Sequence, residues 1–319
     1  MIRSGLLICS FYLKKRFCRN DETVLELNKE YGYNGKNYAN VLCIMKSFCE
    51  NKVEYADDES SMKMFSVLRG SISDWEDNDY IALSFTVHSG QYGLESDLMD
   101  RRTQKVQFHR NEDVADIKSF KCLVLVPNDT DNVKVNKGIF VFQTIATYGV
   151  KTITIKHMKE FFAEMGLTLE TRSVSVRTFV EKLMERGNLH CIKFIKNRIS
   201  SDNSDNIFVS TGREERSYYK PKLTESFKGK ILDFLDGKSN SEVIEIEDNS
   251  CENIKITFKI GSNYRTVELY DINRLSVVED IPDSIFNNGK YDEKVLIEYM
   301  IGIAKTYKNK MVLTVNEDL

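Results

Sequence analysis

The sequence predicts an α+β protein: a β-rich N-terminal half with a mainly antiparallel sheet or partial barrel, followed by a mixed α+β C-terminal half. The first observation is a series of segments rich in β-branched and aromatic residues, most of them bounded by Gly, Asp or Asn. The second is a change near Lys151, after which apolar residues recur at helical spacing between strand-like segments. We therefore expect two domains, a β-rich one over 1–150 and an α+β one over 151–319 that carries a basic segment.

The first half is expected to hold six strands and one helix. The first strand is the apolar run from Gly5 to Leu13, which at nine residues is too short to cross a bilayer as a helix. A basic cluster follows this run, whereas a secretory signal has its basic residues first. The other expected strands are 63–73, 79–90, 104–110, 121–127 and 138–146, the helix lies near 38–49, and 92–102 is expected to be an exposed loop.

The second half is expected to mix helices and strands. A helix over 155–165 is placed to end at Gly166. A second helix follows, because the apolar residues between Ser175, a capping residue, and Gly187 keep helical spacing. The next expected elements are a strand beginning near His190, a helix over 224–237, a hairpin over 252–271 and an amphipathic helix over 293–310.

Composition limits the classes of function. The net charge of -3, from 45 basic and 48 acidic residues, argues against a protein that coats nucleic acid over its whole surface. Any nucleic-acid function must therefore come from a local patch. The seven cysteines are scattered and form no C-x-x-C pair, which predicts reduced thiols in a cytoplasmic protein and gives no zinc-site spacing.

A local patch of this kind lies in the second half. Between His190 and Lys230, nine Lys or Arg residues oppose five Asp or Glu residues, so the segment is +4 in a protein of -3. A solvated surface loop is the alternative interpretation. Aromatic rings inside the segment favour binding, because a ring can stack on a base. The expected nucleic-acid contacts are Lys193, Lys196, Arg198, Arg213, Arg216, Tyr218, Tyr219, Lys220 and Lys222.

No motif names a reaction, so we assign no catalytic residue, metal ligand or cofactor from the sequence. A metal-dependent nuclease is the enzymatic alternative, and it would need two acidic residues and a lysine at the end of a strand. A chain with 48 acidic residues produces such matches by chance. A third possibility is an adaptor whose basic segment meets an acidic partner subunit. The candidate nuclease groups are Asp248 and Glu252 with Lys255, and Glu112 and Asp116 with Lys118.

The run "GIFVFQTIATYGVKTITIKHMKEFFAEMGLTLETRSVSV", followed by "LMERGNLHCIKFIKNRISSD", resembles the central region of RexA-like and KwaB-like phage-exclusion proteins. In those proteins an apolar strand leads to a Thr-containing turn and a helix, and a strand with basic residues follows. The likeness covers about residues 120–205. It implies an antiviral-defence protein, of bacterial or prophage origin, that binds DNA as a homodimer and signals to a membrane-protein partner subunit. It carries over no catalytic residue, and the acidic net charge departs from a simple DNA-coating picture.

Overall fold

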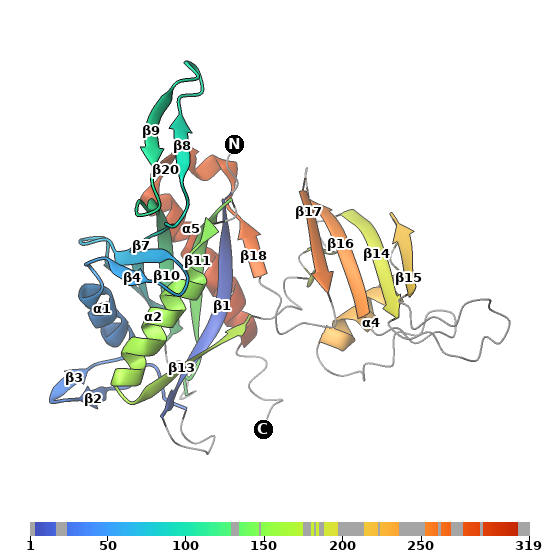
Figure 1. The fold of residues 1–319 in the computed structure, drawn as a ribbon. Coiled ribbons are helices and arrows are strands. Elements are labelled where there is room, and N and C mark those ends of the chain that lie inside the picture. The colour runs from blue at the N-terminus through green and yellow to red at the C-terminus, as the bar shows by residue number, and fades with distance from the viewer. Residues whose placement is uncertain are drawn as a thin grey trace, which may run out of the picture. The chain divides into compact units, whose positions relative to one another are not determined.

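The contacts of the chain divide it into two compact units (Figure 1). The first unit is Met1–Arg172 together with Val278–Leu319, and the second is Ser173–Val277. These bounds differ from the expected halves 1–150 and 151–319, because the segments on both sides of the second unit pair with strands of the first. The structure, a computed structural model, describes residues 4–16, 24–128, 134–146, 148–174, 180, 181, 183, 184, 188–196, 214–222, 224–235, 253–260, 263–268, 277–287 and 290–311.

The elements follow one another along the chain as a β-rich series and then a mixed one. The first unit begins with β1 (Ser4–Lys15), β2 (Tyr31–Tyr33), β3 (Lys36–Tyr38), α1 (Val41–Asn51), β4 (Ala56–Asp58), β5 (Lys63–Val67), β6 (Ser73–Asp77), β7 (Tyr80–Gln91), β8 (Ser96–Met99), β9 (Val106–Arg110), β10 (Asp116–Pro127), β11 (Gly138–Ile145), β12 (Tyr148–Gly149), α2 (Lys151–Glu164) and β13 (Leu167–Ser173). It resumes after the second unit with β18 (Val277–Asp280), the short strands β19 (Phe286–Asn287) and β20 (Lys290–Tyr291), and α5 (Glu293–Met311). The second unit contains β14 (Asn188–Lys196), β15 (Glu214–Tyr219), α4 (Glu225–Leu235), β16 (Asn253–Ile260) and β17 (Asn263–Glu268). The α+β fold class expected from the sequence is confirmed.

A ten-stranded sheet forms the first unit, in the order β13-β1-β11-β10-β7-β5-β4. Its longest ladder is antiparallel and runs without interruption from Asp116 opposite Gln91 to Pro127 opposite Tyr80. The remaining strands β12, β18 and β6 pair with β11, β1 and β7. The described strands leave β13 and β4 at opposite ends of the order, so this sheet is open and does not close into a barrel.

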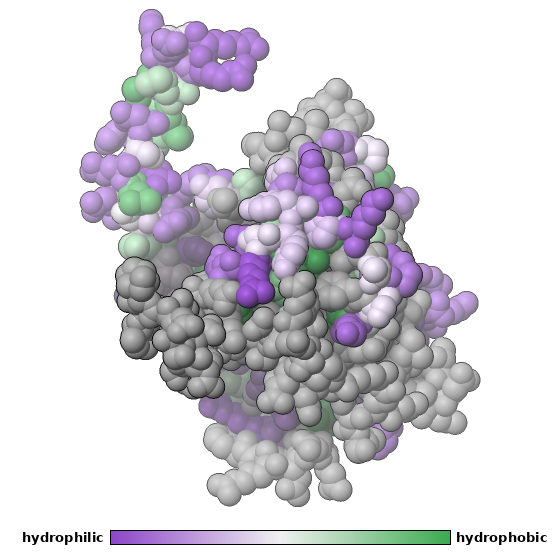
Figure 2. All heavy atoms as spheres, turned by 90° about the vertical axis from the view of Figure 1, so that its right-hand side faces the viewer, coloured by the Kyte–Doolittle hydropathy of each residue, from purple (hydrophilic) through white to green (hydrophobic). Residues whose placement is uncertain are grey.

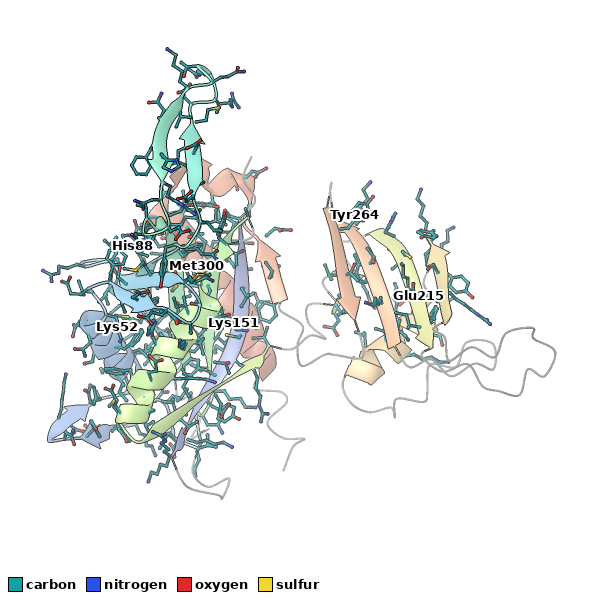
Figure 3. The ribbon with its side chains drawn as sticks, viewed as in Figure 1. Lys52, His88, Lys151, Glu215, Tyr264 and Met300 are labelled. Carbon is teal, nitrogen blue, oxygen red and sulfur yellow. The ribbon has the colours of Figure 1, made fainter. Side chains whose placement is uncertain are left out.

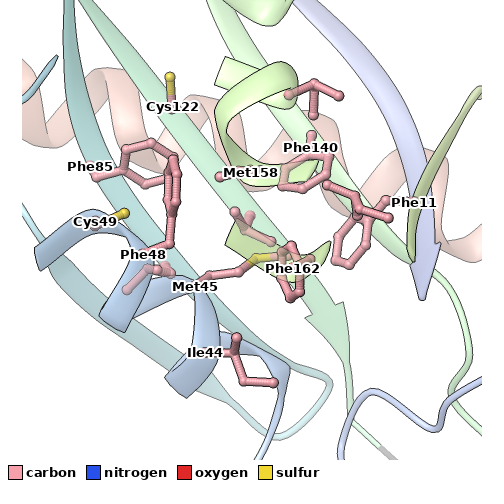
Figure 4. Close-up of a cluster of buried hydrophobic side chains, with 14 of the residues drawn as sticks. Phe11, Ile44, Met45, Phe48, Cys49, Phe85, Cys122, Phe140, Met158 and Phe162 are labelled. Carbon is pink, nitrogen blue, oxygen red and sulfur yellow. The ribbon is translucent and has the colours of Figure 1, made fainter. Parts of the chain in front are cut away.

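Both faces of the central strands are buried. Alternate residues of β10, such as Phe120 and Cys122, join one hydrophobic core with residues of α1 and α2 (Figure 4). The residues between them, such as Leu123 and Leu125, are equally buried, and α5 packs on β10 and β11. Two-sided burial explains why residues 122–126 of β10 and 139–142 of β11 are continuously apolar rather than alternating. The core is tight enough that a Cβ on Gly138 would lie 2.4 Å from the Phe11 ring.

The expected elements are mostly confirmed, with two corrections. The segment 63–73 is not one strand, because a turn at Gly70, with φ of 76°, separates β5 from β6. The segment 92–102 is not a loop, because β8 lies within it and pairs with β9. The expected helix between Ser175 and Gly187 lies largely outside the described residues, although Val180 and Leu183 are buried.

Five cysteines lie in the described part of the chain, and all five are free thiols. Burial raises the pKa of Cys9 to about 12 and raises that of Cys122 well above its usual value. These groups are protonated packing residues at neutral pH. Among the described helices, none has the length and apolar character needed to cross a membrane.

Candidate nucleic-acid interface

The second unit is built on a four-stranded antiparallel sheet, in the order β15-β14-β16-β17. One face of this sheet is apolar: Ile192 lies opposite Ile256, and Phe194 lies opposite Ile254. These side chains are buried, and so is Ile231 of α4. We call this side the covered face.

The other side of the sheet, the open face, is polar. Side chains alternate between faces along a strand, and directly opposed residues share a face. The open face therefore has one row formed by Ser217, Lys193 and Lys255 across three strands. In the next row Thr257 lies opposite Thr266, and their hydroxyl oxygens are 2.9 Å apart.

An aromatic cluster lies beside these rows. The ladder between β14 and β16 shifts register between Leu189 and Cys191, and this irregularity turns the His190 ring toward the open face. The centroid of the His190 ring is 4.6 Å from that of Tyr264 and 6.1 Å from that of Tyr219. Tyr219 is 68% exposed and Tyr264 is 54% exposed, so both rings present surface to solvent.

The charge on the open face is mixed, with lysines in excess. Lys259 lies 5.9 Å above the Tyr264 ring and joins Lys193 and Lys255 on this face. Glu215 on the outer strand β15 is 3.8 Å from Lys193 (Figure 3). Glu268 lies opposite Lys255 in the ladder with β17. Three lysines and three flat rings thus share this face with Glu215.

The structure places the site residues predicted from the sequence on different faces of this sheet. Lys193 and Tyr219 lie on the open face. Tyr218 lies on the covered face, where its ring meets Phe194 edge to face at 5.8 Å, and Arg216 is directly opposite Phe194 on the same face. Both remain exposed because β15 is an outer strand.

The other predicted contacts lie at or beyond the strand ends. Lys220 and Lys222 are exposed just after β15, and the Lys220 amide donates to the His190 carbonyl at 2.8 Å. Lys196 is the last residue of β14 and lies opposite Glu214. Arg198 and Arg213 lie outside the described residues.

The basic and aromatic residues of the open face that were not among the predicted contacts are His190, Lys255, Lys259 and Tyr264. The sequence signal for Lys255 and Lys259 is the alternation in "NIKITFKI", in which these lysines and Thr257 occupy every second position. This alternation predicts the hairpin, but it does not show that the hairpin pairs with β14. That pairing places the lysines beside Lys193.

The candidate nuclease groups give no metal site in the described part of the chain. Lys118 forms an ion pair with Asp116, and its ammonium lies 4.2 Å from the centre of the Tyr148 ring. Asp248 and Glu252 lie outside the described residues. Where side chains are described, no three His, Cys, Asp or Glu residues gather as a metal ion would require.

Comparison with known protein families, with curated proteins and with solved structures found no match for the chain. Its two sheets define it as an α+β protein of two units. The argument for function therefore depends on the open face of the second sheet.

Proposed function

We propose that this chain binds nucleic acid and that the open face holds a single strand. The observation that carries the proposal is the pair of exposed rings, Tyr219 and Tyr264, on either side of His190. An unpaired base offers its flat face to such a ring, whereas a duplex keeps its bases stacked inside. Open four-stranded sheets with exposed aromatic side chains are an effective platform for unpaired bases.

The polar groups beside the rings suit the sugar-phosphate backbone. Lys193, Lys255 and Lys259 are spaced along two neighbouring strands, so a backbone that crosses the sheet passes several ammonium groups. The hydroxyls of Thr257 and Thr266 add donors of the kind that contact phosphate and sugar. DNA remains the expected partner, because the resemblance described above implies it.

Fluorescence anisotropy with labelled single-stranded DNA, single-stranded RNA and a duplex of the same sequence tests the proposal. We expect the single strands to bind more tightly than the duplex. The Tyr219→Ala variant should bind more weakly, and Tyr218→Ala is its matched control, because the neighbouring ring lies on the covered face. Equal binding by wild type and a Tyr219→Ala, Tyr264→Ala double variant would contradict the proposal.

Salt dependence tests the lysines separately from the rings. Each phosphate contact to a single strand contributes about -0.7 to the slope of log affinity against log salt. Replacing Lys193 and Lys255 by Gln should therefore flatten the slope by about 1.4 if each ammonium contacts one phosphate. Arg216→Gln is the control on the opposite face, and an equal effect of that variant would argue against the open face.

We also propose that the chain acts in antiviral defence and signals to a membrane-protein partner, as the resemblance implies. Bacteria that express it should resist phage infection, and the double variant Tyr219→Ala, Tyr264→Ala should lose that protection. Plasmid cleavage with magnesium or manganese would establish the nuclease alternative instead. Co-purification with an acidic partner and no nucleic acid would favour the adaptor alternative.

A further inference from the structure

A β-hairpin projects from the first unit (Figure 1). It consists of β8, β9 and the turn between them, and we call residues 94–110 the arm. In the described structure these two strands pair only with each other. Its base is held by the Arg110 guanidinium, which donates to the Leu94 carbonyl at 3.0 and 3.1 Å, and by the Gly93 amide, which donates to the Glu112 carbonyl at 2.7 Å.

The sides of the arm carry large exposed apolar residues. Leu98 lies directly opposite Phe108, so these two side chains leave the same face of the hairpin. Isolated exposed apolar residues are ordinary, but a group on a narrow ribbon marks an interaction surface. Figure 2 shows hydrophobic side chains along the arm and a hydrophilic tip. The group is Leu94 (58% exposed), Leu98 (55%), Met99 (58%), Val106 (50%) and Phe108 (50%).

Charge is unevenly distributed along the arm. The turn at the tip carries Arg101, Arg102 and Lys105, all exposed. The Asp100 carboxylate in the same turn is engaged locally, because it accepts from the Arg102 amide at 2.9 Å and the Thr103 amide at 2.7 Å. Exposed acidic side chains gather at the base of the arm, namely Glu95, Glu112 and Asp113, while Asp97 is paired with the His109 ring nitrogen at 2.7 Å.

This pattern distinguishes among three kinds of partner. A membrane or a nucleic-acid groove would be entered tip first, and an inserted wedge has its apolar residues at the leading end. Here the leading end is polar and charged, and the apolar residues lie behind it on the sides. Neither partner would use the acidic base, since both are anionic.

We propose that the partner is a second copy of this chain and that two arms pack antiparallel about a twofold axis. In that arrangement the apolar sides bury one another, and each basic tip lies beside the acidic base of the other arm. A twofold interface requires such self-complementarity, because the same patch serves on both subunits. The proposal concerns assembly and is independent of nucleic-acid binding by the open face.

Analytical ultracentrifugation of the full chain over a range of concentrations tests the proposal. We expect a dimer for wild type and a dissociation constant raised on the order of tenfold or more for the Leu98→Asp, Phe108→Asp variant. Val295→Asp is the control, because Val295 is an exposed apolar residue on α5, outside the arm. A monomeric wild type, or a dimer that the arm variant does not weaken, would overturn the proposal.

A charge exchange separates specific pairing from damage to the fold. One variant reverses the base (Glu95→Arg, Glu112→Arg), and another reverses the tip (Arg101→Glu, Arg102→Glu). Each should dimerise weakly alone, because like charges then meet, and an equimolar mixture should form heterodimers. Native mass spectrometry distinguishes the species, and failure of the mixture to pair would contradict the antiparallel arrangement.

Discussion

The two sheets of this protein use the same antiparallel pairing but different burial. In the large sheet, residues 122–126 of β10 and 139–142 of β11 are all apolar and buried, with helices on both faces of these strands. In the small sheet, β14 and β16 bury one face and leave lysine, threonine and aromatic side chains on the other. A sheet with both faces buried contributes to stability but leaves no exposed face on which a ligand could bind. The proposed binding therefore depends on the polar and aromatic side chains that the small sheet leaves at the surface, rather than on the strand pairing itself.

The largest expected effect comes from the large sheet. Phe140 is fully buried, and its ring centroid lies 4.3 Å from that of Phe11. Phe140→Ala should lower the free energy of unfolding by about 3–5 kcal/mol, because it leaves a cavity. Urea denaturation measures the change. Tyr219→Ala on the open face should change the free energy of unfolding by less than about 0.5 kcal/mol. An equal loss of stability in the two variants would contradict the difference in burial between the two sheets.

A polar pair at the edge of the large sheet gives the next effect. Asp58 is buried and accepts from the Lys156 ammonium at 2.8 Å and the Ser60 hydroxyl at 2.6 Å. Asp58→Ala should lower the free energy of unfolding by about 1.5–3 kcal/mol. The exposed pair of Lys193 and Glu215 is the contrast in the small sheet, and Glu215→Gln should cost less than about 1 kcal/mol.

The same pair predicts a pH dependence. The Lys156 ammonium and the Ser60 hydroxyl hold the pKa of Asp58 well below its usual value. A lowered pKa in the folded state means that this stabilisation is complete above the unfolded pKa of about 4 and is lost as the pH falls further. The difference between wild type and Asp58→Ala in urea denaturation should therefore shrink as the pH falls from about 5 to about 2. A difference that stays constant over that range would contradict the assignment.

A ring on the open face should affect binding and leave stability unchanged. Tyr264→Ala should weaken binding of a single strand by about 1–3 kcal/mol, the usual range for one stacked base. Tyr264→Phe keeps the ring and should bind like wild type. Fluorescence anisotropy measures the affinity, and a melting curve measures stability. A fall in melting temperature with no change in affinity would assign Tyr264 to packing.

The smallest effect tests the helical layer that covers the large sheet. The Asn40 side chain caps α1 by accepting from the Cys43 amide at 3.1 Å. Asn40→Ala should lower the free energy of unfolding by about 1 kcal/mol. Asn40→Asp keeps an acceptor and should restore most of the loss. If Asn40→Ala also weakened nucleic-acid binding, the two units would not be energetically separate.

Most of the fold could be predicted because burial leaves a pattern in the sequence. Continuous apolar runs mark β10 and β11, and helical spacing marks α2 and α5. In the arm, the strand over 104–110 was predicted, but β8 was not, because its residues are all exposed and give no alternation. The boundary of the second unit was equally hidden, since it depends on which strands pair with β1.

The candidate site could be predicted only in part. Composition alone identifies the basic segment that contains Lys193 and Tyr219. A strand over 214–219 would also have placed Tyr218 and Tyr219 on opposite faces, because neighbouring residues alternate. The pairing of β14 with β16 could not be predicted, because about sixty residues separate these strands and no local signal sets their register.

The position of the second unit in the chain has a consequence for synthesis. One edge of β1 pairs with β11, and the opposite edge is shared by β13 and by β18, which lies beside Ser4 and Gly5. The ribosome makes β18 about one hundred residues after β13, a delay of roughly 5–20 s at ordinary translation rates. Throughout that interval the N-terminal strand has unpaired backbone groups along part of its edge. The nascent chain is then most exposed to wrong pairing, and the whole second unit must emerge before the first strand of the protein is complete.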